Sequence, residues 1–350
     1  MRRAGARSAI GLVLAFAVLA VSMAVALGIG SVSISVPDVA GVVLRRLGLE
    51  SLGLDFGVTR LEDRIVWQLR MPRVLGAASV GAALAVCGAV LQSLTRNDLA
   101  DPYLLGISGG AAVGAVTVLV LGVSFAGYVG SAAVAFAAFA GAMVALILVL
   151  ALAVGSRGEL PPARLVLAGV AVGQVAGAYT SLLVMLSDQH DAARRVLAWT
   201  LGSVAGMRWN SALAVTVVAL IGAVLFIALA DHLDAFAFGE TSARSLGVNV
   251  VRLRWLLFTI TALVTAILVA YAGAVGFVGL IVPHMVRSIV GPRHRVLLPL
   301  SALVGAVLLV WADLGARTLV DGQEIPLGVV TAAVGAPFFA YLLRRHREAR

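Results

Sequence analysis

The amino-acid sequence predicts an all-α integral membrane protein with about ten transmembrane helices. Of its 350 residues, 61% are hydrophobic and only 12% are charged, whereas about a quarter of the residues in a soluble domain are charged. The mean hydropathy is +1.05. Long apolar windows alternate with short polar stretches, and no change of composition marks a second domain. We therefore expect a single transmembrane domain over residues 1–350.

Ten apolar windows approach the roughly 20 residues that a helix needs to cross a bilayer. The first follows three arginines, at 2, 3 and 7, and is longer than the apolar part of a typical signal peptide, so we expect it to be retained. The eighth is short. The windows are 9–29, 72–92, 105–122, 127–154, 164–186, 211–231, 254–272, 276–291, 297–316 and 327–343.

The distribution of arginine predicts the orientation of these helices. All 26 basic residues are arginines, and an even number of crossings puts both termini on one side. With the termini inside, sixteen arginines lie in cytoplasmic segments and ten in outer ones. Cytoplasmic loops are enriched in basic residues. We therefore expect both termini to be cytoplasmic.

Two outer segments stand out between the windows. Residues 31–68 form the longest predicted loop, and 194–207 within the next long one are predicted as a short surface helix. A weak inverted repeat is also indicated, because 68–73 and 251–255 both open Gly/Ala-rich helices that lie five crossings apart.

Several classes of function are disfavoured by residues that the sequence lacks. Without lysine the chain has no Walker A loop. The scattered arginines form no basic face for nucleic acid, and Cys87 is the only cysteine. Ionisable side chains are almost absent from the windows; Asp313 and Arg317, four residues apart, suggest a local ion pair. We expect no catalytic site, metal or cofactor in this chain.

Glycines recur every four residues in two windows. They are Gly106, Gly110 and Gly114 in the third, and Gly169, Gly173 and Gly177 in the fifth. Such spacing lets helix backbones approach closely. Two interpretations stay open, namely packing within the bundle or the wall of a subunit interface or pathway. Gln174 favours the second for the fifth window.

Residues 239–250 form a polar segment between two apolar windows, on the predicted cytoplasmic side. Gly239 and Gly247 can bracket a short helix, and Glu240 near its start suits the helix dipole. An ordinary polar loop is the alternative.

Several motifs together resemble the permeases of ABC importers for iron–siderophores, haem and cobalamin. They occur in that family's order from about residue 10 to the C-terminus. Asp98 departs from the pattern, since the family usually has proline there. The motifs are RMPR at 70–73, GAALA at 81–85 with Gln92, RNDLADPYLLG at 96–106, ARSLGV at 243–248, GFVGLIVPH at 276–284, GPRHR at 291–295, PLGVVT at 326–331 and GAPFF at 335–339.

The resemblance implies a ten-span subunit that pairs with a second permease subunit, as a homodimer or heterodimer. It also implies two cytoplasmic ABC ATPases, which carry ATP and Mg, and an outer substrate-binding protein. The segment 239–250 would then couple to the ATPase. The residues implied in this coupling are Glu240, Ala243, Arg244, Ser245, Leu246, Gly247 and Val248.

The same resemblance implies three further sites. Arg70, Arg73 and Arg317 would dock the binding protein, although lipid headgroups or Asp313 are alternative partners. The pathway would pass along the dimer axis between the fifth and tenth windows. A cytoplasmic gate would comprise Asn97, Asp98, Leu99, Pro162 and Ala163, and the pathway or dimer interface would include Gly169, Gly173, Gln174 and Gly177.

We therefore expect a permease in the cell membrane that imports a ferric siderophore by alternating access, with cobalamin or haem as alternative cargoes. A stand-alone ion-coupled carrier would need acidic residues within the membrane. An intramembrane enzyme would need catalytic residues, and neither pattern is found in the sequence.

Overall fold

The computed structural model is helical along most of the chain. It describes residues 2–348 apart from 31, 50–56, 123, 125–126, 157, 238, 246 and 321. The elements are α1 (Arg2–Gly28), α2 (Val36–Arg46), α3 (Arg60–Arg64), η2 (Ile65–Arg70), α4 (Met71–Thr95), η3 (Pro102–Leu105), α5 (Ile107–Leu121), α6 (Gly130–Ala153), α7 (Pro162–Met185), α8 (Ala192–Thr200), α9 (Trp209–Ala228), α10 (Ala230–Ala237), α11 (Glu240–Ser245), α12 (Val250–Ala272), α13 (Val278–Val290), α14 (His294–Thr318) and α15 (Leu327–Glu348).

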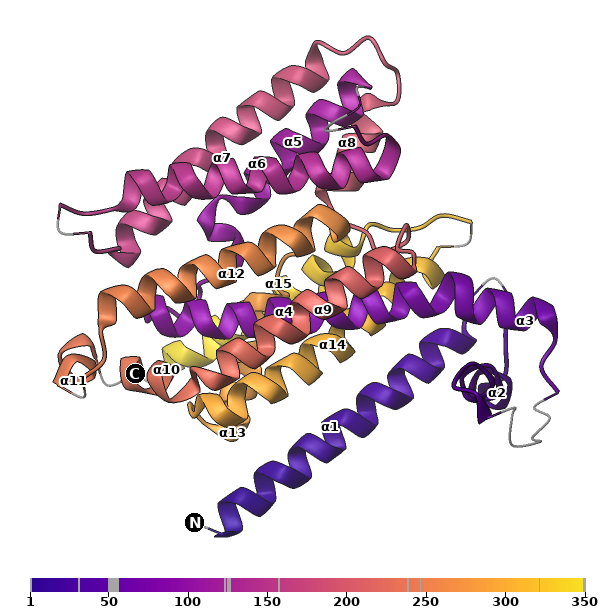
Figure 1. Ribbon diagram of the computed structural model, residues 1–350, viewed down its shortest axis with the longest axis horizontal. Coiled ribbons are helices and arrows are strands. Elements are labelled where there is room, and N and C mark those ends of the chain that lie inside the picture. The colour runs from indigo at the N-terminus through magenta and orange to yellow at the C-terminus, as the bar shows by residue number, and fades with distance from the viewer. Residues whose placement is uncertain are drawn as a thin grey trace.

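The predicted all-α membrane architecture is confirmed. Within the described residues, seven helical stretches are long and apolar enough to cross a membrane, and α5, α13 and the first part of α15 are shorter apolar helices. Together they match the ten predicted windows. The first residues of α1 and the last of α15 lie toward the same end as α11, which we call the α11 end; the opposite one is the α3 end (Figure 1).

The second crossing begins earlier than predicted. One continuous helical stretch covers Arg60–Thr95, so it takes up the last part of the expected loop 31–68, which also contains α2. A capping box starts this stretch: the Thr59 hydroxyl accepts from the Glu62 amide, and the Glu62 carboxylate accepts from the Thr59 amide at 2.9 Å. Charged residues 60–64 hid this start from a search for apolarity.

The predicted surface helix is shifted toward the N-terminus. The sequence suggested 194–207, whereas α8 spans Ala192–Thr200. It ends where Gly202 adopts a φ of 76°, a conformation that glycine accepts readily.

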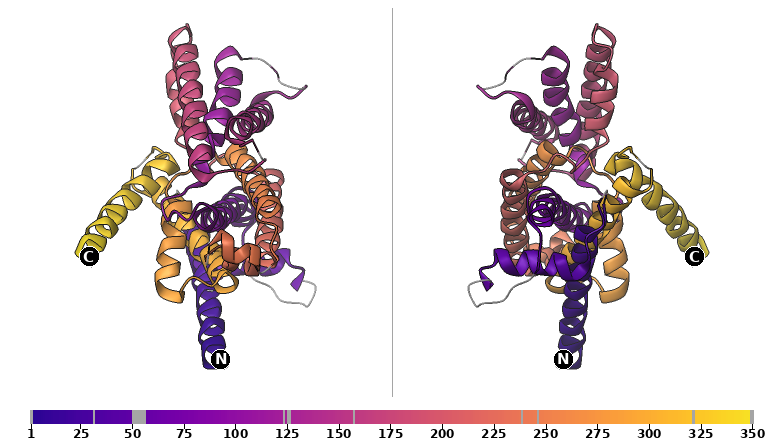
Figure 2. Two further views of the ribbon diagram at one scale, coloured as in Figure 1. Left: turned by 90° about the vertical axis from the view of Figure 1, so that its left-hand side faces the viewer. Right: turned by 90° about the vertical axis from the view of Figure 1, so that its right-hand side faces the viewer.

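Helix α4 lies at the centre of the bundle, and nearly all of it is buried. The two views along the bundle show other helices around it (Figure 2). A Cβ on Gly81 would lie 2.2 Å from the carbonyl oxygen of Gly305 in α14, and one on Gly88 would lie 1.9 Å from that of Gly279 in α13. Glycine therefore sets how closely these helices approach α4.

Helices α5, α6 and α7 form a second group, above α12 in Figure 1. Added Cβ atoms on Gly110 and Gly114 would lie 2.4 and 1.9 Å from backbone oxygens of α6. The glycines of the third window therefore serve packing within the bundle, as one of the two interpretations held. Gly106 does not belong to the helix; it precedes α5 with a φ of 71°.

Helices α1 and α15 lie at the edges. Helix α1 packs on α14, where the indole of Trp311 donates to the Ser22 hydroxyl at 3.0 Å. We call the exposed side of α7, which carries Leu167 and Val175, its open flank. Helix α15 projects away from the bundle on the same side as α7 (Figure 2). Large apolar side chains are exposed on α7 and α15, among them Leu167, Val175 and Val334.

Candidate functional sites at the two ends of the bundle

The polar segment 239–250 contains the predicted short helix, α11. Gly239 and Gly247 have φ angles of 98° and 81°. The Gly247 amide donates to the Arg244 carbonyl at 2.9 Å and the Val248 amide to the Ala243 carbonyl at 3.1 Å, which is a Schellman ending. Leu246 and the side chain of Glu240 lie outside the described residues.

Helix α11 has one buried face and one exposed face. The Ala243 side chain is fully buried, whereas Arg244 and Ser245 are exposed. Asn249 then caps α12 by accepting from the Arg252 amide at 3.0 Å. The segment thus lies between a turn at Gly239 and the capped start of α12, and Arg244 and Ser245 lie at its surface.

The preceding helix, α10, is attached to the start of α14. The Asp234 carboxylate accepts from both the Nδ1 and the backbone N of His294, at 2.6 and 3.0 Å. Nearby, Arg295 binds Asp231 through two hydrogen bonds of 2.6 and 2.8 Å, which lower the pKa of the Asp231 carboxyl. Sequence reasoning missed both contacts, although the motif at 291–295 was one carrier of the resemblance.

His294 also contacts α4, because its Nε2 lies 2.6 Å from the Ser93 hydroxyl. Serine, histidine and aspartate thereby join in one chain, which the sequence did not reveal because their positions lie 201 and 60 residues apart. This is no exposed nucleophile. His294 is 3% exposed, and Ser93 lies inside α4 with its hydroxyl 3.0 Å from the Ala89 carbonyl.

The predicted gate residues 97–99 form an exposed turn after α4. The Asn97 side chain accepts from the Leu99 amide at 3.0 Å. Asp98 accepts from the Arg287 guanidinium of α13 at 2.5 Å, so its carboxylate contacts the neighbouring helix. Pro162 and Ala163 open α7, which starts toward the same end of the bundle (Figure 1).

A short helical piece, η3, follows the turn and was not predicted. It lies among α4, α5, α7 and α12. The Tyr103 hydroxyl accepts from the Val275 amide at 3.0 Å, and the Asp101 carboxylate accepts from the Tyr103 amide at 2.9 Å. The backbone at Leu104 packs directly on Gly169 of α7, where a Cβ would lie 1.8 Å from its carbonyl oxygen.

The glycines of the fifth window divide into two kinds. Gly169 is buried against η3, whereas a Cβ on Gly173 or Gly177 would meet nothing within 4 Å. Gln174 is exposed beside them. Each step of four residues turns about 40° beyond a full helical turn, so the row drifts from the bundle interior to the open flank of α7.

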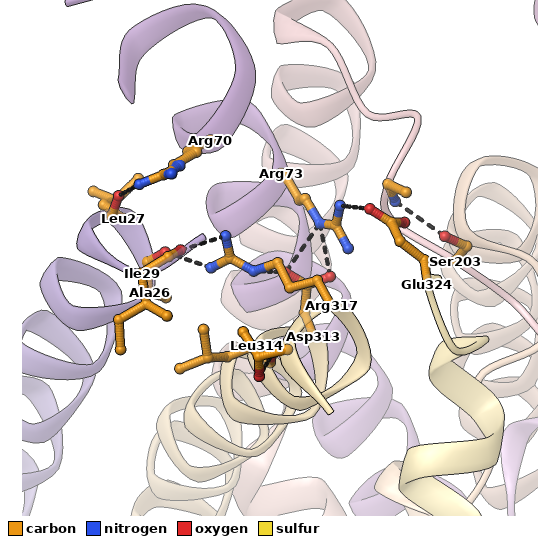
Figure 3. Close-up of polar contacts among 12 residues, drawn as sticks. Ala26, Leu27, Ile29, Arg70, Arg73, Ser203, Asp313, Leu314, Arg317 and Glu324 are labelled. Carbon is orange, nitrogen blue, oxygen red and sulfur yellow. Dashed lines mark hydrogen bonds and ion pairs between the residues drawn. The ribbon is translucent and has the colours of Figure 1, made fainter. Parts of the chain in front are cut away.

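At the α3 end, the three predicted docking arginines form an internal charge cluster (Figure 3). The Arg70 guanidinium donates to the Leu27 and Gly28 carbonyls at 2.7 and 3.0 Å, and also to that of Val32. It therefore bonds the Leu27 carbonyl at the end of α1 and shares the Gly28 carbonyl with the Ile34 amide, which donates to it at 2.9 Å. Arg70 is only 7% exposed.

Arg73 and Arg317 meet at Asp313. The Arg73 guanidinium bonds Asp313 through its Nε at 2.9 and 3.1 Å and Glu324 through its Nη1 at 2.8 Å. Arg317 lies 3.7 Å from Asp313, confirming that predicted pair, and donates to the carbonyls of Ile29 and Ala26. The cluster therefore joins α1, α4, α14 and the segment before α15.

Within the described residues, no group of three or more His, Cys, Asp or Glu side chains is placed to hold a metal ion.

Comparison with known proteins identifies the class as the permeases of ABC importers. The model of the FecCD transport family matches residues 18–345. The chain belongs to this family. It is therefore a multi-pass protein of the cell membrane and a transport permease, whose ATPase is a separate subunit.

Individual relatives cover most of the chain. It is 46% identical over 303 residues to the cobalamin import system permease of Halobacterium salinarum, covering 85% of this chain and 78% of the relative. It is 44% identical over 289 residues to the vitamin B12 import system permease of Vibrio cholerae, covering 82% and 85%. A solved structure of an inward-facing metal-chelate type ABC transporter shares 30% identity, with a TM-score of 0.82 over 95% of this chain and 98% of the other.

Proposed function

We propose that this chain is the permease subunit of an ATP-driven importer for a corrinoid of the cobalamin type. The support for this cargo is the identity of 46% and 44% to permeases named for cobalamin and vitamin B12. The sequence-based preference for a ferric siderophore has no support from these relatives. A metal chelate is the second candidate, favoured by the likeness to the metal-chelate type transporter.

The polar segment 239–250 is the observation that supports ATP-driven function best. The absence of lysine leaves the chain without a Walker A loop, so the energy must come from a partner. Arg244 and Ser245 are exposed on α11, and Gly239 and Gly247 flank this helix with positive φ angles. The arginine excess predicted for this end favours a cytoplasmic location. Segment 239–250 is accordingly the proposed docking element for an ABC ATPase.

The proposed assembly contains two permease subunits, two ATPases that bind ATP and Mg, and an outer binding protein. The second permease, identical or related, would cover the open flank of α7 and the projecting α15, which expose large apolar side chains. Gly173, Gln174 and Gly177 lie on that flank. Asn97–Leu99 and the start of α7, at Pro162 and Ala163, would form the cytoplasmic gate.

Docking of the binding protein at the α3 end would involve arginines that already have partners within the chain. Arg73 and Arg317 are mostly buried, with side chains 12% and 9% exposed, and both contact Asp313. An acidic partner would compete with Asp313 and Glu324 for Arg73. We therefore propose that the three arginines mainly stabilise the permease and contribute to docking of the binding protein as a secondary role.

A reconstituted transporter tests the proposal. The full chain is combined with its ATPase and binding protein in vesicles, and ATP-dependent uptake of cobalamin and of a ferric siderophore is measured. The complex should contain two permeases and two ATPases and should take up cobalamin. Uptake of the siderophore alone would replace the cargo, and transport by a monomer without ATP hydrolysis would contradict the whole scheme.

A charge reversal tests the docking element. Arg244→Glu should lower both substrate-stimulated ATP hydrolysis and uptake, because the exposed guanidinium lies at the proposed contact. Arg252→Glu is the matched control, since Arg252 is also exposed at the α11 end but lies outside 239–250. Equal activity of the two variants would remove the assignment.

A further inference from the structure

A buried hydrogen-bonded chain connects α10 with α4 through the first residue of α14. The Asp234 carboxylate lies 2.6 Å from Nδ1 of His294, and Nε2 of the same ring lies 2.6 Å from the Ser93 hydroxyl. His294 is 3% exposed. Such short contacts around a buried imidazole hold all three helices in one relative position, because separating them would leave polar groups unpaired.

Each hydrogen bond between Asp234, His294 and Ser93 has a donor and an acceptor in both protonation states of His294. When His294 is neutral, its Nδ1–H donates to Asp234 and its Nε2 accepts the Ser93 hydroxyl. When the ring is protonated, both nitrogens donate, and the Ser93 hydroxyl donates instead to the Ala89 carbonyl 3.0 Å away. The connection from α10 to α4 is therefore complete in either state.

Asp234 makes the attachment firmer by bonding the backbone as well. Its carboxylate accepts from the His294 amide at 3.0 Å, one of the amides that the start of α14 leaves without an intrahelical partner. A shift of α10 therefore cannot occur without moving the first turn of α14 or breaking two bonds to one carboxylate.

Asp234 and Ser93, the two ends of this hydrogen-bonded series, each lie close to a proposed functional element. Helix α10 leads through Gly239 directly into α11, the proposed ATPase contact. Ser93 lies in the last turn of α4, four residues before Asn97. The exposed turn 97–99 that follows is the proposed cytoplasmic gate. The three hydrogen-bonded side chains thus connect the proposed ATPase contact with the proposed gate turn.

We propose that Asp234, His294 and Ser93 are positioning residues that transmit movement of the ATPase-docking segment to the gate end of α4. This inference rests on the proposed function of 239–250. It predicts that loss of the hydrogen bonds between these three residues uncouples ATP hydrolysis from transport and leaves the assembly of the complex intact.

The test measures cobalamin moved per ATP hydrolysed in vesicles that hold the complete transporter. Ser93→Ala removes only the hydroxyl at the α4 end. His294→Asn keeps the backbone cap and a short polar side chain but does not reach Ser93. Thr95→Val is the matched control, because the Thr95 hydroxyl likewise bonds the carbonyl four residues earlier, at 2.7 Å, and lies in the same helical turn.

In both test variants, cobalamin moved per ATP should fall about fivefold or more, the range expected for coupling between sites, while the complex retains two ATPases. Thr95→Val should keep the wild-type ratio. An unchanged ratio in an assembled Ser93→Ala transporter would overturn the inference. So would a loss of uptake and ATP hydrolysis in parallel with loss of assembly in His294→Asn, since that outcome describes a purely structural role.

Failure of this inference is distinguishable from failure of the proposed function. If the wild-type complex imports cobalamin and Arg244→Glu abolishes it, the function stands, and the ratio in Ser93→Ala alone decides the inference. If the wild-type complex shows no ATP-dependent import of any cargo, both are overturned.

Discussion

Replacing Arg73 by methionine should destabilise the protein more than replacing its partner Asp313 by asparagine. Arg73→Met leaves the Asp313 carboxylate, whose side chain is 3% exposed, with only the Arg317 guanidinium at 3.7 Å. Asp313→Asn is milder. Arg73 keeps Glu324 at 2.8 Å, and Arg317 keeps its backbone carbonyls.

The expected magnitudes follow from this asymmetry. Breaking a buried ion pair by removing one partner costs about 3–5 kcal/mol, and Arg73→Met belongs to this class. Asp313→Asn loses charge-assisted hydrogen bonds worth about 1.5–3 kcal/mol, because its former partners retain others. At about 2 °C per kcal/mol for a large domain, Tm should fall by about 6–10 °C in the first variant and about 3–6 °C in the second.

The single cysteine supplies the assay. Cys87 is fully buried in α4, so a thiol-reactive fluorogenic dye labels the detergent-solubilised protein only as it unfolds. The same variants are titrated with the binding protein at low and high salt. The control is Arg208→Met, because Arg208 is exposed and precedes α9 at the same end.

An unchanged Tm in Arg73→Met, together with weaker and salt-dependent association of the binding protein, would refute the reasoning. It would show that Arg73 acts outward and that its bonds to Asp313 and Glu324 contribute little. A larger loss of stability in Asp313→Asn than in Arg73→Met would refute the order worked from the contacts.

Two further predictions concern packing and the gate. Gly88→Ala puts a Cβ 1.9 Å from the Gly279 carbonyl oxygen and should lower Tm strongly, whereas Gly173→Ala meets nothing within 4 Å and should raise stability by up to about 1 kcal/mol through helix propensity. Asp98→Asn removes the negative charge from the contact with Arg287. Because Asp98 is 58% exposed, the free energy of unfolding measured with the dye should change by no more than about 1 kcal/mol. A Tm loss as large as that of Gly88→Ala would show that the turn is a packing element.

The length of the apolar windows was sufficient to locate the seven helices of membrane-spanning length and the three shorter apolar helices in the described part of the chain, because hydrocarbon excludes polar backbone and permits few alternatives. It failed where polar residues continue a helix, as in α3, and where the chain turns back, as in η3. The capping pair Thr59 and Glu62 was a sequence signal for the first case. The second depends on Tyr103 reaching Val275, a contact between positions 172 residues apart.

The candidate sites were predicted unevenly for the same reason. The helix between Gly239 and Gly247 depends on interactions between residues close in sequence, so the two glycines were enough to indicate it. The row Gly169, Gly173 and Gly177 was recognised, but only neighbouring segments decide that the first is buried and the others are open. The roles in coupling, gating and docking are still predictions.

The sequence by itself determined that this chain is an α-helical membrane protein without the lysine of a Walker A loop. Composition, window length and the missing lysine are properties of the chain, and they hold whatever the packing. Only the tertiary structure decided that Arg70 and Arg73 turn inward and that Asp234 reaches Ser93 through His294. The reason is physical: buried charges and hydroxyls must find partners, and the partners come from helices that the sequence does not place side by side.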